Sequence, residues 1–171
     1  PHLYSGEMAA QNMVFESLVK NTNNGVKPWL AQSWDISEDG KEYTFHLRQD
    51  VEFTDGEKFN AEVVKMNFDA IIENVERHSW LDLVNEIKDT EVVDEYTFKL
   101  TLKHPYYPTL EELALTRPFR MLSPKCFIDK NTKDGINGYI GTGPWVLSEH
   151  EENQYAIFTA NKNYYGEKPK V

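Results

Sequence analysis

The fold class of this chain follows from the stretch SEDGKEYTFHLR at residues 37–48. An Asp-Gly pair between apolar segments, as here, is typical of the turn of a β-hairpin. After the turn, Tyr43, Phe45 and Leu47 alternate with polar residues. A period of two with one apolar face predicts a half-buried strand. A hairpin is therefore expected, with the apolar residues of 29–34 on the other side of its turn.

The same patterns predict two further hairpins. Residues 96–102 alternate apolar and polar side chains, and an Asp-Glu turn joins them to the valines at 92–93. Near the end of the chain, residues 145–147 and 155–159 flank a polar Glu-Glu-Asn turn. Both segments have the spacing of paired antiparallel strands.

Helices are predicted in three places. Asn60 can cap a helix whose apolar residues, from Val64 to Val75, recur every three or four positions. A short helix is expected over residues 80–87, and another within residues 1–20, before the break at 21–25. Strand pairs beside helices, without regular βαβ alternation, indicate an α+β fold with an antiparallel or mixed sheet and flanking helices.

Composition excludes several classes of function. The chain has 171 residues and a formal net charge of -10, which disfavours nucleic acid and anionic membrane surfaces as partners. No stretch approaches the roughly 20 apolar residues of a membrane helix. The single cysteine, Cys126, excludes an internal disulfide and is expected to be a small buried hydrophobe. Because the chain begins at Pro1, it is expected to be a piece of a longer protein.

No catalytic signature is present, so the chain is not expected to be an enzyme. It lacks the nucleophile elbow, the zinc-protease motif, the phosphate loop and the dinucleotide fingerprint. Residues 141–144, Gly-Thr-Gly-Pro, are expected to form a tight turn before a strand. The histidines are His2, His46, His78, His104 and His150. Since none pairs with another at metal-ligand spacing, no metal site is expected within this chain.

Two regions are candidates for ligand binding. Arg117 and Arg120 flank a Pro-Phe pair, and arginine can hold a carboxylate through two parallel hydrogen bonds. The alternative is an ion pair with one of the many acids of the chain. Trp80 follows Arg77 and a histidine and is either a stacking platform or part of the core. The residues alone thus indicate an acidic α+β domain that binds a small anion, with an enzyme fragment or an interaction module as alternatives.

Three sets of motifs, found in this order along the chain, resemble the signatures of the family 5 extracellular solute-binding proteins. These proteins are the peptide- and nickel-binding receptors of ABC importers. The first set is Trp34-x-x-Ser37-Glu38-Asp39-Gly40-Lys41, Tyr43-Thr44-Phe45-x-Leu47-Arg48 and Val51-x-Phe53-x-Asp55-Gly56-Glu57-x-Phe59-x-Ala61-Glu62; the others are Gly141-Thr142-Gly143-Pro144-Trp145 and Asn163-Tyr164-Tyr165-Gly166-Glu167-Lys168-Pro169.

Other stretches resemble the nickel-binding branch of that family rather than the peptide-binding branch. They are Pro1-His2-Leu3-Tyr4, Arg77-His78-Ser79-Trp80-Leu81, Tyr106-Tyr107-Pro108 and Glu112-Leu113-Ala114-Leu115-Thr116-Arg117-Pro118-Phe119-Arg120. The resemblance implies a two-lobed receptor of the type II periplasmic-binding-protein fold, of which this chain supplies the N-terminal third. Residues 1–25 would open the N-terminal lobe. Residues 26–171 would form the subdomain inserted into that lobe and the return toward it.

The resemblance also implies a function and a site. The receptor would capture nickel as a complex with a small organic chelator, in the periplasm or outside the cell, free or tethered by a lipid. It would deliver the complex to an ABC permease as a monomer, without a nucleic acid or a catalytic partner. Arg117 would pair with the anionic chelator, Trp80 would lie against its apolar faces, Tyr4 and Met8 would line the mouth of the cleft, and Arg77 would act at longer range through water. The histidine ligand of the family lies in the other lobe, so no metal ligand is expected here.

Three alternatives remain open at this point. The same scaffold could bind an oligopeptide as an added strand in an extended groove. It could bind an opine-type metallophore, which also needs arginine and aromatic contacts. From another class of function, the chain could be a sensor or docking module with an exposed apolar patch over residues 4–15.

Overall fold

A computed structural model describes residues 5–151 and 154–170, with only the backbone of residues 5–8. The helices are α1 (Ser5–Val14), α2 (Ala61–Glu73), α3 (Val75–His78), α4 (Asp82–Glu86), α5 (Thr109–Leu113) and α6 (Thr116–Phe119), and η1 (Pro124–Cys126) is a 3-10 turn. The strands are β1 (Val19–Thr22), β2 (Gly25–Pro28), β3 (Ala31–Ile36), β4 (Glu42–Leu47), β5 (Ile87–Asp94), β6 (Thr97–Leu102), β7 (Trp145–Glu151) and β8 (Tyr155–Ala160).

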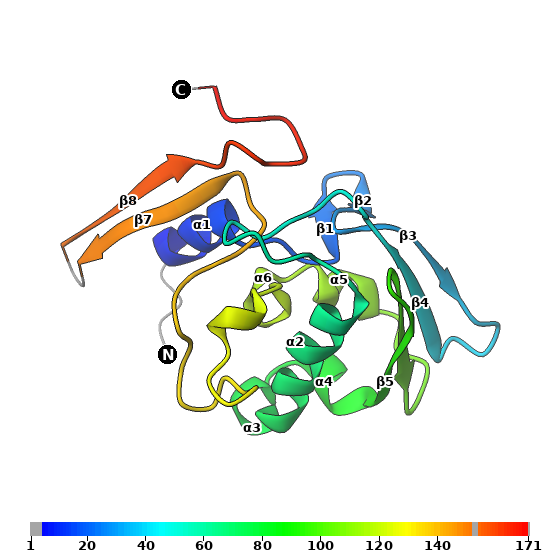
Figure 1. Cartoon of the computed structure of the whole chain (residues 1–171). Helices are drawn as coiled ribbons and strands as arrows, with labels where there is room; N and C mark the ends of the chain where they lie inside the picture. Colours follow the sequence, from blue (N-terminus) through cyan, green and yellow to red (C-terminus); the bar gives the residue numbers. More distant parts are fainter. Residues whose placement is uncertain (1–4, 152–153, 171) are drawn as a thin grey trace.

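The strands form one four-stranded sheet, in the order β3-β4-β6-β5, and two separate hairpins, β1-β2 and β7-β8. Figure 1 shows the four-stranded sheet on one side of the helices, and the β7-β8 hairpin beside α1 on the other side. All pairs among the described residues are antiparallel. The predicted α+β class is confirmed, and the sheet is antiparallel rather than mixed.

The three predicted hairpins are confirmed. Trp34 of β3 lies opposite Phe45 of β4, and Phe45 lies opposite Phe98 of β6. Tyr43, Phe45 and Leu47 are all buried, as their alternation predicts. The third hairpin pairs residues 145–151 with residues 155–160.

Helix α2 connects the sheet to the rest of the molecule. Its predicted cap is confirmed, since the Asn60 side chain accepts a hydrogen bond of 3.1 Å from the backbone N–H of Val63. The Phe68 ring on α2 lies 5.2 Å from that of Phe98 on β6 and 5.8 Å from that of Phe119 on α6. One ring of α2 therefore packs against both the sheet and α6.

The helix predicted through Val19 is shorter than expected. It ends at Val14, and Val19 instead begins β1 and pairs with Pro28. All residues from Val14 to Val19 are buried. A helix lying on the surface buries only one face, so six buried residues in succession require an extended segment inside the core. Similarly, the helix predicted over residues 80–87 is limited to α4, because Ile87 already belongs to β5.

The Gly-Thr-Gly segment before β7 lies directly on the N-terminal segment. A Cβ at Gly141 would lie 2.2 Å from the carbonyl oxygen of Val14, and one at Gly143 would lie 2.5 Å from that of Met13. The backbone N–H of Gly143 donates to the Val14 carbonyl at 2.9 Å. The glycines are therefore needed for close backbone approach as well as for the bend before β7.

The remaining histidines outside the cleft described below have local partners. His46 pairs with Asp35 at 2.8 Å, and His104 pairs with Glu86 at 3.0 Å. His150 stacks edge-on against Tyr139. These three histidines are thus surface or locally bonded groups, whereas His2 lies outside the described residues. Cys126 is buried, as expected, and burial raises the pKa of its thiol.

Candidate functional site: an arginine-lined cleft

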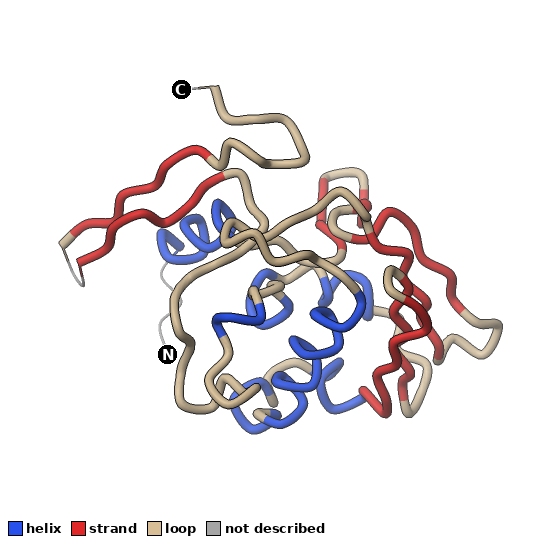
Figure 2. Tube along the Cα trace, in the orientation of Figure 1, coloured by secondary structure: helices blue, strands red, loops and turns tan. Residues whose placement is uncertain are grey.

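A cleft of about 560 Å³ opens between α1, α2, α3, α6 and the loop at residues 127–139. Figure 2 shows the long loop that follows η1 passing beside these helices on its way to β7. The cleft is lined by aromatic rings from the loop and from Phe15, which follows α1, by side-chain amides from α1 and α2, and by cationic groups from α3 and the segment around α6. It has the mixed apolar and polar lining typical of small-molecule sites.

The charges of this cleft are opposite in sign to those of the chain. Arg77, Arg117, Arg120 and His78 line it, and no Asp or Glu is found among its lining residues in the described part of the chain. The chain as a whole carries a formal charge of -10. Three guanidinium groups gathered in one cleft repel one another, so the arrangement favours an anionic ligand between them. We call this group the arginine cleft.

Two of the arginines are held by the protein. The Nη2 of Arg77 donates to the carbonyl of Lys133 at 2.8 Å, which ties α3 to the loop on the other wall. The Nη1 of Arg120 donates to the Oε1 of Gln11 at 2.7 Å, and its guanidinium lies 5.1 Å from the centre of the Phe15 ring. The bond to Lys133 uses one of the five N–H donors of the Arg77 guanidinium.

Arg117 is different because its side chain is exposed. It makes no hydrogen bond or ion pair with a residue that the structure describes. The alternative interpretation of Arg117, an ion pair with a nearby acid, therefore has no support in the described part of the chain. An exposed guanidinium at the cleft can take a carboxylate in the two-bond geometry.

The segment that carries Arg117 and Arg120 is positioned by Asn67 of α2. The Nδ2 of Asn67 donates to the carbonyl of Leu122 at 3.0 Å, and its Oδ1 accepts from the N–H of Leu122 at 2.9 Å. The same Nδ2 also donates to the carbonyl of Val63 at 2.9 Å. Because Asn67 is buried, these hydrogen bonds fix the position of the Arg117–Leu122 segment along the axis of α2.

The positive charges of the cleft affect the pKa of His78. Burial lowers the pKa of His78 from its ordinary 6.5, and the positive charges of Arg117, Arg77 and Arg120 lower it further. The three guanidinium groups therefore act on one imidazole, although they come from two distant parts of the sequence. The cleft is a single electrostatic site.

Trp80 is close in sequence to Arg77 and His78, but it does not line the arginine cleft. Its exposed fraction is 56%, so the alternative interpretation of Trp80 as a core residue is wrong. It follows α3 directly and is accessible for contact with a ligand or with another part of a longer chain. Its role as a ligand contact stays a prediction.

The structure does not describe the side chains of the other two predicted site residues, Tyr4 and Met8. Tyr4 lies outside the described residues, and Met8 lies in α1 at a position where only the backbone is described. The structure brings Arg77 and Arg117 to one cleft together with Arg120, which belongs to the same candidate region as Arg117. It adds His78 and Asn67, which were not predicted as binding residues. His78 belongs to the same short motif as Arg77 and could have been included on that ground. No sequence pattern indicates a role for Asn67, because that role depends on contact with Leu122, which is far away along the chain.

Among the described residues, no group of three or more His, Cys, Asp and Glu side chains gathers in a geometry that could hold a metal ion. No described helix has the length and apolar character needed to cross a membrane.

Comparison with known proteins agrees with these features. Residues 25–171 match the family described as bacterial extracellular solute-binding proteins, family 5, middle region. The chain belongs to this family. The resemblance inferred from the sequence motifs is thereby confirmed.

Relatives in the family include binders of nickel and of peptides. The chain is 51% identical to the nickel-binding periplasmic protein of Escherichia coli K12, over 100% of its own length and 33% of that protein. It is 32% identical to di/tripeptide-binding protein 4 of Pseudomonas aeruginosa, over 85% of its length and 31% of that protein. The chain thus spans about a third of the length of these relatives.

Solved structures give the same result for the fold. NikA from Brucella suis in complex with Fe(III)-EDTA matches with a TM-score of 0.93 and 51% identity, over 99% of this chain and 34% of NikA. NikZ from Campylobacter jejuni in complex with Ni(L-His) matches with a TM-score of 0.81 and 34% identity, over 92% of this chain and 32% of NikZ. The fold described here is therefore a fragment of the family 5 solute-binding fold.

Proposed function

We propose that this chain is part of the substrate-binding component of a nickel ABC importer and that it captures nickel as an anionic complex with a small organic chelator. The observation that carries the proposal is the arginine cleft, which gathers Arg77, Arg117 and Arg120 in a chain of charge -10. Cations alone would be repelled by these groups, whereas a metal enclosed by carboxylates would be attracted.

The relatives support this choice of ligand. The identity to a nickel-binding periplasmic protein, 51%, exceeds the 32% identity to a di/tripeptide-binding protein. Two structural relatives were solved with metal chelates, Fe(III)-EDTA and Ni(L-His). A site built from guanidinium groups suits such ligands because it contacts the carboxylates and leaves the metal to its chelator.

The wider setting belongs to the same proposal. Residues 1–25 would open the N-terminal lobe of a two-lobed receptor, and residues 26–171 would form its inserted subdomain and the return toward the main lobe. The receptor would act outside the cytoplasmic membrane, as a monomer, and would pass the chelate to a permease. No catalytic step is part of this function.

Calorimetric titration of the full-length receptor tests the proposal. Ni²⁺ together with L-histidine is expected to give heat of binding, and Ni²⁺ alone is expected to give none, since the arginine cleft recognises the anionic part of the complex. Fe(III)–EDTA, a chelate without nickel, is expected to compete for the same site. Binding of a dipeptide, with no response to any chelate, would overturn the proposal and move the protein to the peptide-binding branch.

A further inference from the structure

One wall of the arginine cleft begins with a tight turn in the loop after η1. The backbone groups of Ile128 and Asn131 bond to each other in both directions, at 2.9 and 3.0 Å. The two residues between them, Asp129 and Lys130, have φ values of 50° and 62°. Two successive residues at positive φ form a turn of type I′, which residues other than glycine adopt only where surrounding contacts hold it. Contacts outside the turn must therefore stabilise it.

The side chain of Asn131 supplies these contacts. Its Oδ1 accepts a hydrogen bond of 2.9 Å from the Nδ2 of Asn74, and its Nδ2 donates to the carboxylate of Glu73. Both partners lie where α2 ends and α3 begins. Asn74 is buried and is itself held there, because its Nδ2 also donates to the carbonyl of Ala70 at 2.8 Å. One side chain thus joins the turn to the start of α3.

The same side chain positions the backbone of Lys133. The Oδ1 of Asn131 accepts from the N–H of Lys133 at 2.8 Å and from that of Thr132 at 2.6 Å. The carbonyl of Lys133 in turn accepts from the Nη2 of Arg77 at 2.8 Å. Hydrogen bonds therefore connect Asn131, through the backbone of Lys133, to the guanidinium of Arg77.

Arg77 faces the cleft, whereas Asn131 does not line it. Arg77 is exposed, and ordering a long exposed side chain costs conformational entropy. A guanidinium that is already bonded to a fixed carbonyl has lost this freedom before a ligand arrives, so an anion binds it at a lower entropic cost. Asn131 can therefore strengthen binding without touching the ligand.

We propose that Asn131 is a positioning residue of the arginine cleft, which holds the carbonyl of Lys133 where it fixes the guanidinium of Arg77 for an anionic ligand. Without Asn131 the turn loses its contacts with α2 and α3, and Arg77 returns to the many conformations of a free side chain. This inference rests on the proposed function in requiring that an anionic chelate bind in the cleft.

A double-mutant cycle in the full-length receptor tests the coupling between the two residues. Affinity for Fe(III)–EDTA is measured by calorimetry for the wild type, Asn131→Ala, Arg77→Gln and the double variant. We expect Asn131→Ala to weaken binding by about three- to tenfold and Arg77→Gln by about tenfold. In the Arg77→Gln background, Asn131→Ala should change affinity by less than about twofold, because the group that it positions is gone. A merely structural loss would lower affinity in both backgrounds alike.

Two further variants separate positioning from a loss of stability. Asn161→Ala removes a buried amide outside the cleft, which donates to the carbonyl of Gly143 at 2.9 Å and accepts from the N–H of Asn163 at 3.0 Å. It should lower stability in urea unfolding and leave affinity unchanged. The exchange variant Glu73→Gln/Asn131→Asp keeps the charge of the pair and reverses its hydrogen bond, so it should recover most of the affinity that Asn131→Ala loses.

The outcomes separate this inference from the proposed function. Unchanged affinity in Asn131→Ala or in Arg77→Gln overturns the inference and leaves the proposed function standing. Equal losses from Asn131→Ala in both backgrounds, or a folded exchange variant that binds no better than Asn131→Ala, do the same. If Asn131→Ala fails to fold, Asn131→Ser replaces it in the cycle, since it is neutral and its short side chain loses the contacts with α2. Absence of binding by both Fe(III)–EDTA and Ni²⁺ with L-histidine overturns the proposed function, and this inference with it.

Discussion

The hydroxyl of Tyr165 donates a hydrogen bond of 2.7 Å to the carboxylate of Glu16, across 149 positions of the chain. The hydroxyl of Tyr164, at 2.6 Å, and the indole N–H of Trp29, at 3.0 Å, donate to the other oxygen of the same carboxylate. Thr142 donates at 3.0 Å to the oxygen that Tyr165 also contacts. Glu16 is fully buried. One carboxylate therefore joins the N-terminal segment, the glycine-rich bend and the last described loop.

Replacing Glu16 with alanine is expected to destabilise the protein strongly. The change leaves four donors without their acceptor, and each donor left unpaired in a buried site costs about 1–3 kcal/mol. Water admitted to the vacated space recovers part of this, so we expect a loss of about 3 kcal/mol or more. Urea unfolding of the full-length receptor measures it. The control is Glu149→Ala, which removes an exposed carboxylate that accepts one bond from Tyr155. Equal losses in the two variants would contradict the role of Glu16.

The titration of Glu16 predicts a pH dependence of stability. Burial raises the pKa of Glu16 above its ordinary 4.5, and this effect exceeds the lowering by its hydrogen bonds. The unfolded chain therefore loses this proton near pH 4.5, whereas the folded chain keeps it to a higher pH. Between these values the folded state binds more protons, so the Glu16 contribution to the free energy of unfolding falls as the pH rises.

The pH dependence is measured by comparing the wild type with Glu16→Gln by urea unfolding between about pH 4.5 and 7. Subtracting the variant removes the contributions of all other titrating groups. The stability of the wild type relative to the variant should decrease as the pH rises. An increase with pH would mean that the hydrogen bonds outweigh burial and that the pKa of Glu16 is lowered instead.

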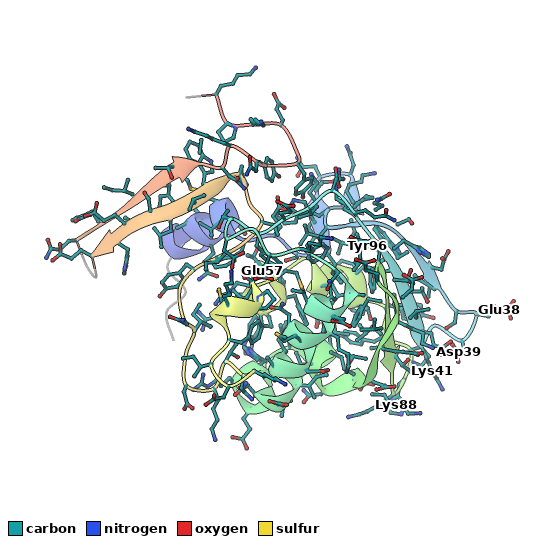
Figure 3. All side chains as sticks on the ribbon, viewed as in Figure 1. Glu38, Asp39, Lys41, Glu57, Lys88 and Tyr96 are labelled. Carbon is teal, nitrogen blue, oxygen red and sulfur yellow. The ribbon has the colours of Figure 1, made fainter. Side chains whose placement is uncertain are left out.

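Replacing Arg117 with glutamine is expected to weaken the binding of an anionic chelate by about 10- to 100-fold, since it removes a charge-assisted pair worth about 1.5–3 kcal/mol. Arg117→Lys should recover only part of the loss, because an ammonium group lacks the two-bond geometry. Calorimetry with Fe(III)–EDTA measures both. Lys88→Gln, at an exposed position of β5 labelled in Figure 3, removes the same charge outside the cleft and should have little effect. Similar losses for Arg117→Gln and Lys88→Gln would indicate long-range attraction without contact.

Replacing Trp80 with alanine is expected to leave stability unchanged within about 0.5 kcal/mol, because the ring is exposed. If the ring lies against the ligand, chelate affinity should nevertheless fall, as apolar contact area is lost. Thermal unfolding and calorimetry on the same variant separate the two effects. Tyr107→Ala, at an aromatic residue with an exposed fraction of 94%, is the matched control. Unchanged affinity would remove Trp80 from the site.

The hairpins could be predicted because their signals are local. In β4 the alternation of Tyr43, Phe45 and Leu47 is itself the inward face of the strand, and the cap at Asn60 depends on a residue three positions away. The first helix was predicted too long because its end depends on contacts with distant residues and not on a local signal. Phe15, Leu18 and Val19 have the spacing of a helical face, but the core surrounds the segment on all sides and favours an extended chain.

The candidate site could be predicted only in part. Arg77 and Arg117 stand out in the sequence as cations beside aromatic residues, and family resemblance placed both at a ligand. That they share a cleft with Arg120 and His78 depends on Asn67, whose bonds to Leu122 draw the second segment onto α2. Whether Arg117 is paired with an acid also depends on which side chains surround it, and sequence spacing carries no such information.

The amino-acid sequence by itself determined the α+β class, the three hairpins, the capped helix and the membership of the family, because these depend on periodicity, turns and motifs within short stretches. Tertiary structure decided the end of the first helix, the partners of Glu16 and the arginine cleft. Each of these depends on burial and on charges contributed by segments far apart in the chain. Burial withdraws a residue from water and so strengthens whatever charge or hydrogen bond the fold places beside it.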